Sequence, residues 1–209
     1  MSTEVKSEVL KVLEDRHSVK QYQVGHKMPK ADLDQLLKST SQAPSSWNLQ
    51  HWKLLVIDDQ AQKEKLLPIA YGQKQIVESS VVIAILGDLE ANKNTERVFG
   101  PAVEAGHMPK ELYDTLAGQI EGAYQYPQVA RDEAIRNGSL AAMQLMIAAK
   151  AMGYDTCPMG GYDAAKFVEA FNVPARYVPV MLISVGLAAT PARPSGRLPL
   201  DQIIVSNSF

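Results

Sequence analysis

The chain has 209 residues, 46% of them hydrophobic and 21% charged, and a formal net charge of −2. This length suits one domain with a sizeable core, and the lack of a clustered basic surplus argues against a nucleic-acid-binding protein. The single cysteine, Cys157, excludes an intramolecular disulfide, and the sequence shows neither a signal peptide nor an apolar run of roughly 18 residues, so we expect a cytoplasmic protein without a membrane span.

The first quarter of the chain alternates helix with polar loop. Residues 5–14 place apolar side chains at helical spacing among Lys and Glu, which predicts a short amphipathic helix. Residues 16–22 lack that spacing and indicate a loop or an extended segment. A second helix is expected to begin at Pro29 and to end before Pro44, because proline suits a first helical turn. A loop at residues 44–52, rich in amide, hydroxyl and indole groups, follows it.

Four apolar runs have the composition of strands. They cover residues 54–57, 80–87, 179–187 and 203–205. The run at 80–87 is unbroken and β-branched, which indicates a strand buried on both faces. The prolines of residues 191–199 exclude a helix or a central strand just before the last run.

Helical patterns lie between these runs. We expect helices at residues 60–67, 109–124, 131–152 and 164–171, and an irregular polar segment at residues 88–107. The Ala- and Met-rich third helix is apolar around nearly its whole circumference, which predicts burial on most sides. Asp163 is expected to cap the last helix, because its carboxylate can accept hydrogen bonds from free amides. Strands interleaved with helices in this way predict a layered α+β or α/β domain.

The Ala- and Met-rich helix leads into Cys157-Pro158-Met159-Gly160-Gly161-Tyr162, which we interpret as a tight turn. Paired glycines let a backbone approach a flat ligand closely, because no Cβ intervenes. The alternative is a turn that needs glycine only for its positive φ.

Familiar catalytic and metal-binding motifs are missing. The sequence lacks Gly-x-Gly-x-x-Gly, a Walker phosphate loop and Gly-x-Ser-x-Gly. One Cys and four scattered His give no zinc spacing, so we expect no metal ion.

Three polar loops remain as candidate binding segments. Residues 16–20 offer cations and a hydroxyl that suit a phosphate or an electron-rich ring edge. Residues 45–50 offer amides that can pair with a heterocycle, and residues 195–197 place an arginine on a stiff, proline-bounded segment. Taken singly, the three loops have structural alternatives: a solvated basic turn, a helix-to-strand loop with capping hydroxyls, and an exposed arginine.

Taken together, these loops and the glycine pair resemble the nitroreductase family of FMN-dependent NAD(P)H oxidoreductases. The matching pieces follow one another in the family's order along almost the whole chain. They are Arg16-His17-Ser18-Val19-Lys20-Gln21-Tyr22, Ala43-Pro44-Ser45-Ser46-Trp47-Asn48-Leu49-Gln50-His51-Trp52, Gly153-Tyr154, Pro158-Met159-Gly160-Gly161-Tyr162-Asp163, Gly186-Leu187 and Pro194-Ser195-Gly196-Arg197-Leu198-Pro199-Leu200.

The resemblance implies an α+β fold with a central mixed sheet of about four to five strands flanked by helices. It implies a single FMN-binding domain over residues 1–209, with a variable helical excursion at residues 88–128 near the active site. It also implies an obligate homodimer with two FMN sites at the subunit interface, and a C-terminal strand that can pass to the partner subunit.

The resemblance assigns the flavin contacts to both subunits. Arg16, Ser18 and Arg197 would hold the phosphate and ribityl end. Lys20 would approach the N1/O2 edge of the isoalloxazine, where a cation stabilises the anionic reduced flavin. The backbone of Gly160-Gly161 would lie beside flavin N5. The other cofactor-binding residues would be His17, Gln75, Pro158, Met159 and Ser195, with Pro44, Ser45, Ser46, Asn48 and Gln50 from the partner subunit.

The reaction implied by the resemblance is ping-pong. NAD(P)H would give hydride to FMN, and a nitroaromatic or quinone acceptor would then take it, with no catalytic side chain required. Tyr124 or Tyr126 is a candidate aromatic lid over the substrate, and the alternative is ordinary packing at a helix end. The alternative functions are those of a flavin reductase, a dehalogenase-type enzyme and a flavin-binding protein without turnover.

The chain departs from the family pattern at two positions. His51 stands where many members have proline, and Ser195 stands where a second basic residue often binds phosphate. Arg197 would therefore act alone or with Arg193.

Overall fold

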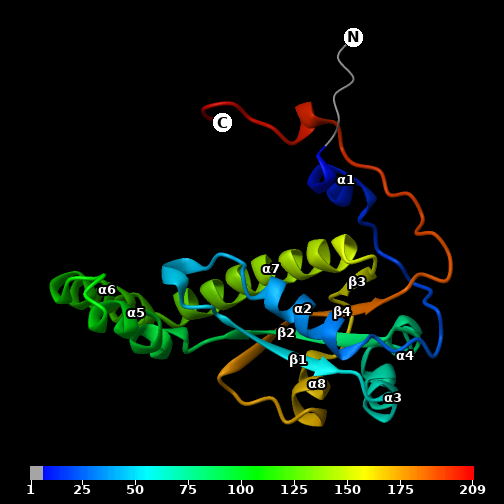
Figure 1. Ribbon diagram of the computed structural model, residues 1–209, viewed down its shortest axis with the longest axis horizontal. Helices are drawn as coiled ribbons and strands as arrows, with labels where there is room; N and C mark the ends of the chain where they lie inside the picture. The colour runs from blue at the N-terminus through cyan, green and yellow to red at the C-terminus, as the bar shows by residue number, and fades with distance from the viewer. Residues whose placement is uncertain (1–6) are drawn as a thin grey trace.

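A four-stranded antiparallel sheet in the order β1-β2-β4-β3 forms the centre of the molecule (Figure 1). The computed structural model describes residues 7–209. Its strands are β1 (Trp52–Ile57), β2 (Val81–Asp88), β3 (Asp155–Met159) and β4 (Tyr177–Gly186). The register pairs Ile83 of β2 with Ile183 of β4, so the two central strands come from opposite halves of the chain.

Helices cover both faces of the sheet (Figure 1). They are α1 (Glu8–Asp15), α2 (Lys30–Thr40), α3 (Gln60–Ile69), α4 (Gln75–Glu78), α5 (Thr95–Glu104), α6 (Lys110–Tyr124), α7 (Pro127–Ala151) and α8 (Ala164–Ala170), with the 3-10 turns η1 (Ser46–Asn48), η2 (Ala91–Asn94) and η3 (Leu200–Gln202). Helices α2 and α7 pack on one face, and α3 and α8 on the other. Helices α5 and α6 extend beyond one end of the sheet (Figure 1). The α+β architecture expected from the sequence is confirmed.

The side chains of β2 alternate between two cores. One set, including Val82 and Leu86, packs with Phe167 of α8. The other set, including Ile83, packs with Leu145 of α7. Every residue of β2 is buried, which confirms the prediction of a strand covered on both faces.

Asp163 caps α8 as expected. Its Oδ1 accepts a hydrogen bond from the backbone amide of Lys166 at 3.0 Å. The helix therefore begins where the aspartate satisfies an amide without an intrahelical partner.

Parts of the sheet and of the following segment differ from the expectations. The four strands pair antiparallel, and within residues 7–209 parallel pairing is limited to an isolated bridge between Ser18 and Thr156. Residues 157–159, expected in a turn, belong to β3, where Pro158 is tolerated because β3 is the outer strand of the four. The segment 88–107, expected to be irregular, contains η2 and α5.

Two apolar segments are exposed in the structure, although the sequence predicted that one would be a buried helix and the other a strand. Helix α7 packs only one side on the sheet, so Leu140 and Met143 are 43% and 38% exposed, and the expectation of burial on most sides is wrong for the single chain. Residues 203–205 form no strand, because they have no neighbouring strand to pair with, and each is more than half exposed. Val5 and Lys6, at the start of the first expected helix, lie outside the described residues. Within residues 7–209, the structure contains no helix long and apolar enough to span a membrane.

Candidate functional site

The segment before α2 runs along β3 and brings two of the three polar loops together. The backbone amide of Val19 donates to Thr156 of β3 at 3.0 Å. This pairing places Ser18 and Lys20 in the wall of a cleft of about 620 Å³, which Ser195 also lines. The cleft is further lined by Gln21, Lys74, Glu78, Thr190, Pro191, Ala192, Arg193 and Pro194. The first and third candidate loops, 175 positions apart in the chain, therefore share one cleft.

Gln75 connects this cleft to the end of β3. Its side chain is 6% exposed, and its Nε2 lies 3.5 Å from the sulfur of Met159. The same Nε2 donates to Gln73 Oε1 at 3.1 Å, and Gln73 Nε2 donates to the carbonyl of Gly161 at 2.8 Å. A chain of amide contacts thus links α4 to the glycine pair. Gln73 and Lys74 were not identified from the sequence as candidate site residues. The signal that could have identified them is their position next to Gln75 in the sequence.

Neither the backbone conformation nor steric crowding within the chain requires glycine at positions 160 and 161. Neither Gly160 nor Gly161 has positive φ, so the alternative of a turn needing positive φ is wrong. A Cβ on Gly160 would meet no heavy atom within 4 Å, and one on Gly161 would meet only Gln73 Nε2, at 4.0 Å. The open space beside this backbone fits a flat ligand that approaches the main chain closely.

Cys157 is part of the core rather than of this cleft. The side chain is 3% exposed, and burial raises the pKa of its thiol, an effect that the charge of Lys20 opposes. Cys157 is therefore a small buried side chain and an unreactive thiol at neutral pH.

Three of the expected cofactor-binding residues do not line the same cleft. Arg16 follows α1, and its backbone amide closes that helix. His17 lines an adjoining hollow with Lys150 and Asp155. Arg197 is exposed and binds its own loop, with Nη1 3.0 Å from Ser195 Oγ.

The second polar loop is anchored to α7. The backbone amide of Ser46 donates to Asn137 Oδ1 at 2.9 Å, and Ser46 Oγ donates to Glu133 Oε2 at 2.5 Å. Asn137 Nδ2 also donates to Glu133 Oε2, at 2.8 Å. Burial disfavours the charged form of Glu133, but the hydrogen bonds from Ser46 and Asn137 and the charge of Arg136 outweigh burial and lower the pKa of Glu133. The carboxylate is thus ionised and saturated with donors.

The backbone of this loop is strained. Trp47, Asn48 and Gln50 have φ of 50°, 55° and 52°, a region that costs a non-glycine residue about 1–2 kcal/mol. Ser45 Oγ accepts from the amide of Gln50 at 2.9 Å, and Leu49 is fully buried. These contacts, together with the anchor on α7, hold the loop in one conformation with the side chains of Asn48 and Gln50 exposed.

Tyr124 packs beneath this loop. Its ring lies 6.3 Å from that of His51, which is fully buried, whereas Tyr124 is half-buried. Burial raises the pKa of Tyr124 and lowers that of His51. Among residues 7–209 neither the Tyr124 hydroxyl nor either ring nitrogen of His51 has a hydrogen-bond partner. This packing favours the structural alternative for Tyr124, whereas Tyr126, 66% exposed, is free to act as a lid.

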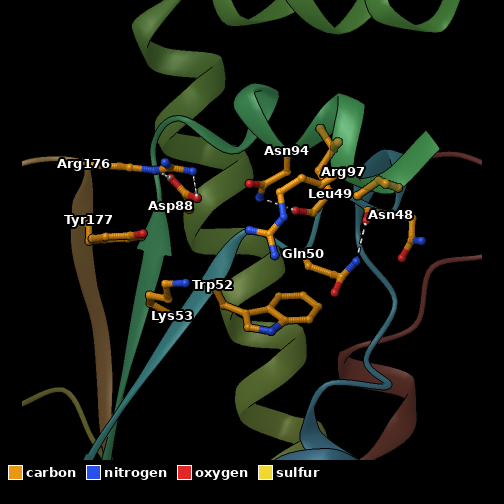
Figure 2. Close-up of a pocket in the computed structure, with 11 residues that line it drawn as sticks. Asn48, Leu49, Gln50, Trp52, Lys53, Asp88, Asn94, Arg97, Arg176 and Tyr177 are labelled. Carbon is orange, nitrogen blue, oxygen red and sulfur yellow. Dashed lines mark hydrogen bonds and ion pairs between the residues drawn. The ribbon is translucent and has the colours of Figure 1, made fainter. Parts of the chain in front are cut away.

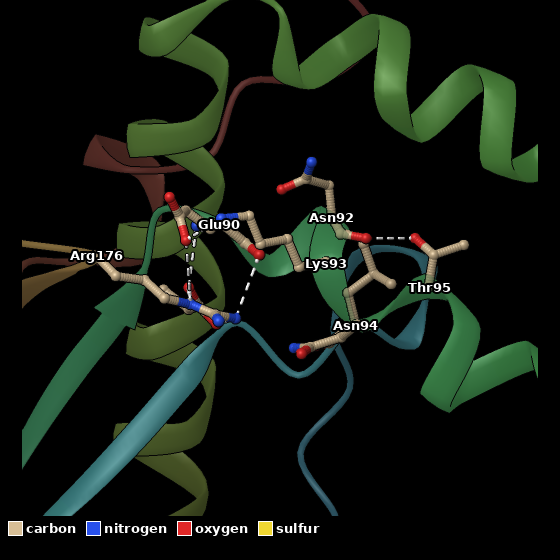
Figure 3. A network of polar contacts seen from close by, with 8 residues as sticks. Glu90, Asn92, Lys93, Asn94, Thr95 and Arg176 are labelled. Carbon is tan, nitrogen blue, oxygen red and sulfur yellow. Dashed lines mark hydrogen bonds and ion pairs between the residues drawn. The ribbon is translucent and has the colours of Figure 1, made fainter.

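A second cleft, of about 440 Å³, opens beside the strained loop (Figure 2). Asn48 and Gln50 of the loop, Lys53 of β1 and Arg97 of α5 are among the residues that line it. Its floor contains Asp88, a buried carboxylate. The Asp88 Oδ1 and Oδ2 atoms accept from Arg176 Nε and Nη2 at 2.7 and 2.6 Å. Figure 3 shows the same arginine reaching the Glu90 backbone.

The two clefts lie at opposite ends of the central strands. Trp52, which follows the strained loop, pairs with Gly87, the second-to-last residue of β2. Thr156, beside Ser18, pairs with Val185, which in turn pairs with Val81 at the start of β2. Within one chain, the structure therefore does not bring the Pro44–Gln50 loop to the Ser18 cleft.

Comparison with known proteins gives the same family from sequence and from fold. Residues 13–187 match the model of the nitroreductase family. The chain is 54% identical over 194 residues to the "Putative NAD(P)H nitroreductase YodC" of Bacillus subtilis (strain 168), a match that covers 93% of this chain and 96% of the relative. It is 30% identical over 190 residues to the "CLA biosynthesis enone reductase" of Lactiplantibacillus plantarum, covering 88% of each chain.

A solved structure agrees with both. The crystal structure of a putative nitroreductase from Exiguobacterium sibiricum 255-15 in complex with FMN superimposes with a TM-score of 0.88 at 39% identity, over 95% of this chain and 97% of that one. The chain belongs to the nitroreductase family.

Proposed function

We propose that this chain is an FMN-dependent oxidoreductase that takes hydride from NAD(P)H and reduces nitroaromatic or quinone-type acceptors by a ping-pong mechanism. The enzyme class, and FMN with NAD(P)H as donor, follow from membership of the family. The single observation that carries the site is its arrangement along β3: Ser18 and Lys20 line a cleft beside the strand, and Gln75 and the open Gly160–Gly161 backbone lie at its end.

Each group at this site has a role that its chemistry supports. When bound, FMN supplies a ring that accepts and releases hydride. Lys20 and Ser18 offer a cation and a hydroxyl for the ring edge and the ribityl chain. Gln75 is oriented by its bond to Gln73, so its amide is positioned for a polar ring edge. The glycine backbone leaves room for the ring to stack closely.

The phosphate would be held by Arg16 and Arg197, with His17 and Ser195 nearby. Among residues 7–209 Arg197 binds only its own loop, so this role requires the segment after Pro191 to move toward the ligand. Arg193 already lines the cleft and is the second candidate cation.

A homodimer completes the proposed site. The Pro44–Gln50 loop lies at the opposite end of β2 from Ser18, so its exposed amides can meet a flavin only in a second copy. The exposed apolar side chains of α7, Leu140 and Met143, and residues 203–205 are surfaces that such a partner would cover. We propose that the carboxyl-terminal segment crosses to that partner. A single domain over residues 1–209 and a cytoplasmic location remain predictions.

A conjugated enone is a second candidate acceptor. The observation that favours it is the 30% identity to an enone reductase over 88% of both chains. An enone, like a quinone, accepts hydride at a polarised double bond, so the same site serves both.

Anaerobic stopped-flow mixing tests the proposal. The purified protein should be yellow, should release FMN rather than FAD on denaturation, and should lose its flavin absorption band on mixing with NADH or NADPH. Re-oxidation by a nitroaromatic, a quinone or an enone then identifies the acceptor class. A protein that takes up no FMN, or whose flavin band persists with both donors, would contradict the proposed function.

A further inference from the structure

The second cleft contains two cations that have no carboxylate partner in the described part of the chain. Lys53 and Arg97 both line it and are exposed, and neither forms a hydrogen bond or an ion pair with any residue in the range 7–209. Figure 2 shows the Arg97 guanidinium projecting into the cleft toward Gln50 and Trp52. Cations of this kind are suited to charge-assisted hydrogen bonds with a phosphate or a carboxylate.

Nearby carboxylates are bound by other residues. Both oxygens of Asp88 are taken by Arg176. Glu96 accepts from the Tyr113 hydroxyl at 2.5 Å, and Glu90 accepts from Lys93 at 2.7 Å (Figure 3). Asp88 and Glu90 are thus offset by Arg176 and Lys93, and of these acids only Glu96 keeps a charge to set against Lys53 and Arg97. The cleft therefore has a positive excess that attracts an anion.

The volume of the cleft and the aromatic residue in its lining also suit a nucleotide. Its volume of about 440 Å³ lies in the range of small-molecule pockets, about 300–1,000 Å³. Trp52 is half-buried in the wall, and its indole faces the same space as Arg97 (Figure 2). A cleft lined by an aromatic ring and two cations suits a purine joined to a phosphate, because the base can stack while the phosphate pairs with the cations.

We propose that this cleft binds the adenosine-phosphate half of the NAD(P)H donor, with Arg97 and Lys53 holding its phosphates and Trp52 facing its base. The inference rests on the proposed function in one respect: Asn48 and Gln50 of the cleft wall are proposed flavin contacts in the partner subunit. A nicotinamide stacked on that flavin has its adenosine half attached through a diphosphate, and the cleft beside the loop is where this half can lie.

Binding of a donor fragment tests the site without any turnover. Isothermal titration of the flavin-loaded protein with adenosine 2′,5′-bisphosphate should give saturable binding. Arg97→Gln and Lys53→Gln should each weaken it about tenfold, the effect of losing one charge-assisted hydrogen bond. Lys38→Gln and Arg131→Gln, exposed cations outside the cleft, are matched controls and should leave the affinity unchanged. Failure of the wild-type protein to bind the fragment, or equal binding by all variants, overturns the inference.

Stopped-flow reduction separates the donor from the acceptor. Arg97→Gln should raise the concentration of NADPH that gives half-maximal flavin reduction about tenfold, and should have little effect with reduced nicotinamide mononucleotide, which lacks the adenosine half. An equal effect on both donors overturns the assignment. An effect seen only on re-oxidation by 4-nitrobenzoate, and not by nitrobenzene, would give the site to an acceptor carboxylate instead. If the fragment binds but wild-type flavin is not reduced, the proposed function fails and the nucleotide site stands.

Discussion

The side chain of Asn137 in α7 holds the backbone of Ser46, 91 positions earlier, through a 2.9 Å hydrogen bond from the Ser46 amide to Asn137 Oδ1. Asn137 is 1% exposed, so the bond is shielded from water. It connects the long helix of the core directly to the strained loop that carries Asn48 and Gln50. The conformation of a proposed flavin-binding loop thus depends on a core residue of α7.

Replacing Asn137 with Ala should destabilise the protein and weaken FMN retention together. The change removes a buried hydrogen bond to the loop and one to Glu133, which costs about 1–3 kcal/mol of unfolding free energy. Thermal unfolding and fluorescence titration with FMN measure the two effects. Asn92→Ala, an asparagine bound to Glu121 on the surface, is the control. Unchanged FMN affinity in a destabilised Asn137→Ala protein would limit Asn137 to a structural role.

Replacing Lys20 with Gln should lower the flavin reduction potential. A cation near the ring stabilises the anionic reduced form, and loss of about 1.5 kcal/mol corresponds to about 30 mV for a two-electron couple. Equilibration with a reference dye measures the potential. Lys74→Gln, which removes a charge from the same cleft, tests whether the effect is specific to Lys20. Equal shifts of the reduction potential in both variants would indicate a general electrostatic effect of the positive charges in the cleft rather than a direct contact between Lys20 and the flavin.

Replacing Arg197 with Ala should weaken FMN binding by about 1.5–3 kcal/mol, or roughly 10- to 150-fold, because an ionic hydrogen bond to phosphate is lost. The variant should fold normally, since Arg197 is exposed and bonds only to its own loop. Equilibrium titration of apoprotein with FMN gives the affinity. Wild-type affinity in this variant would transfer the phosphate role to Arg16 or Arg193.

The stability of the protein should fall as the pH drops below 6.5, in part because of His51. Burial lowers the pKa of His51, so the unfolded chain binds a proton that the folded chain excludes. Above pH 6.5 His51 is neutral in both states and its contribution to stability is fully present. Below pH 6.5 each pH unit lowers the unfolding free energy by at most about 1.4 kcal/mol, until the pH reaches the pKa of His51 in the folded protein. Urea unfolding at pH 7.5, 6 and 5 measures the slope. His51→Leu should reduce the slope in this window, and an unchanged slope would assign it to other groups.

Placing charge on the exposed side of α7 should break the proposed dimer. Leu140→Glu and Met143→Glu put a carboxylate on a surface that the partner would bury, and should yield monomers that lose FMN. Sedimentation velocity measures the oligomeric state, and the flavin absorption of the gel-filtered protein measures how much FMN it retains. Val24→Glu, at a side chain 78% exposed in a loop, is the matched control. Monomeric wild-type protein that retains its flavin would refute the dimer itself.

Local signals in the sequence determined much of the fold. The unbroken β-branched run found in β2 and the cap at Asp163 were predicted correctly, because each depends on neighbours within a few residues. The β3 strand was missed because Pro158 and two following glycines give a turn signal, and only pairing with β4 makes the segment a strand. The carboxyl-terminal strand was predicted from its apolar residues, but a strand needs a partner that the single chain does not supply.

The sequence by itself also determined the family, since its motifs keep their order along the chain, and it named Ser18, Lys20 and Gln75 as candidate binding residues. Only the tertiary structure decided which of them meet. It joined Ser18 and Lys20 to Ser195 and Gln75 to Met159, placed the Pro44–Gln50 loop at the far end of β2, and revealed Gln73, Glu133, Asn137 and the Lys53–Arg97 cleft. Contacts between side chains distant in sequence leave no periodic or local pattern, so they become visible only when the sheet and helices are packed.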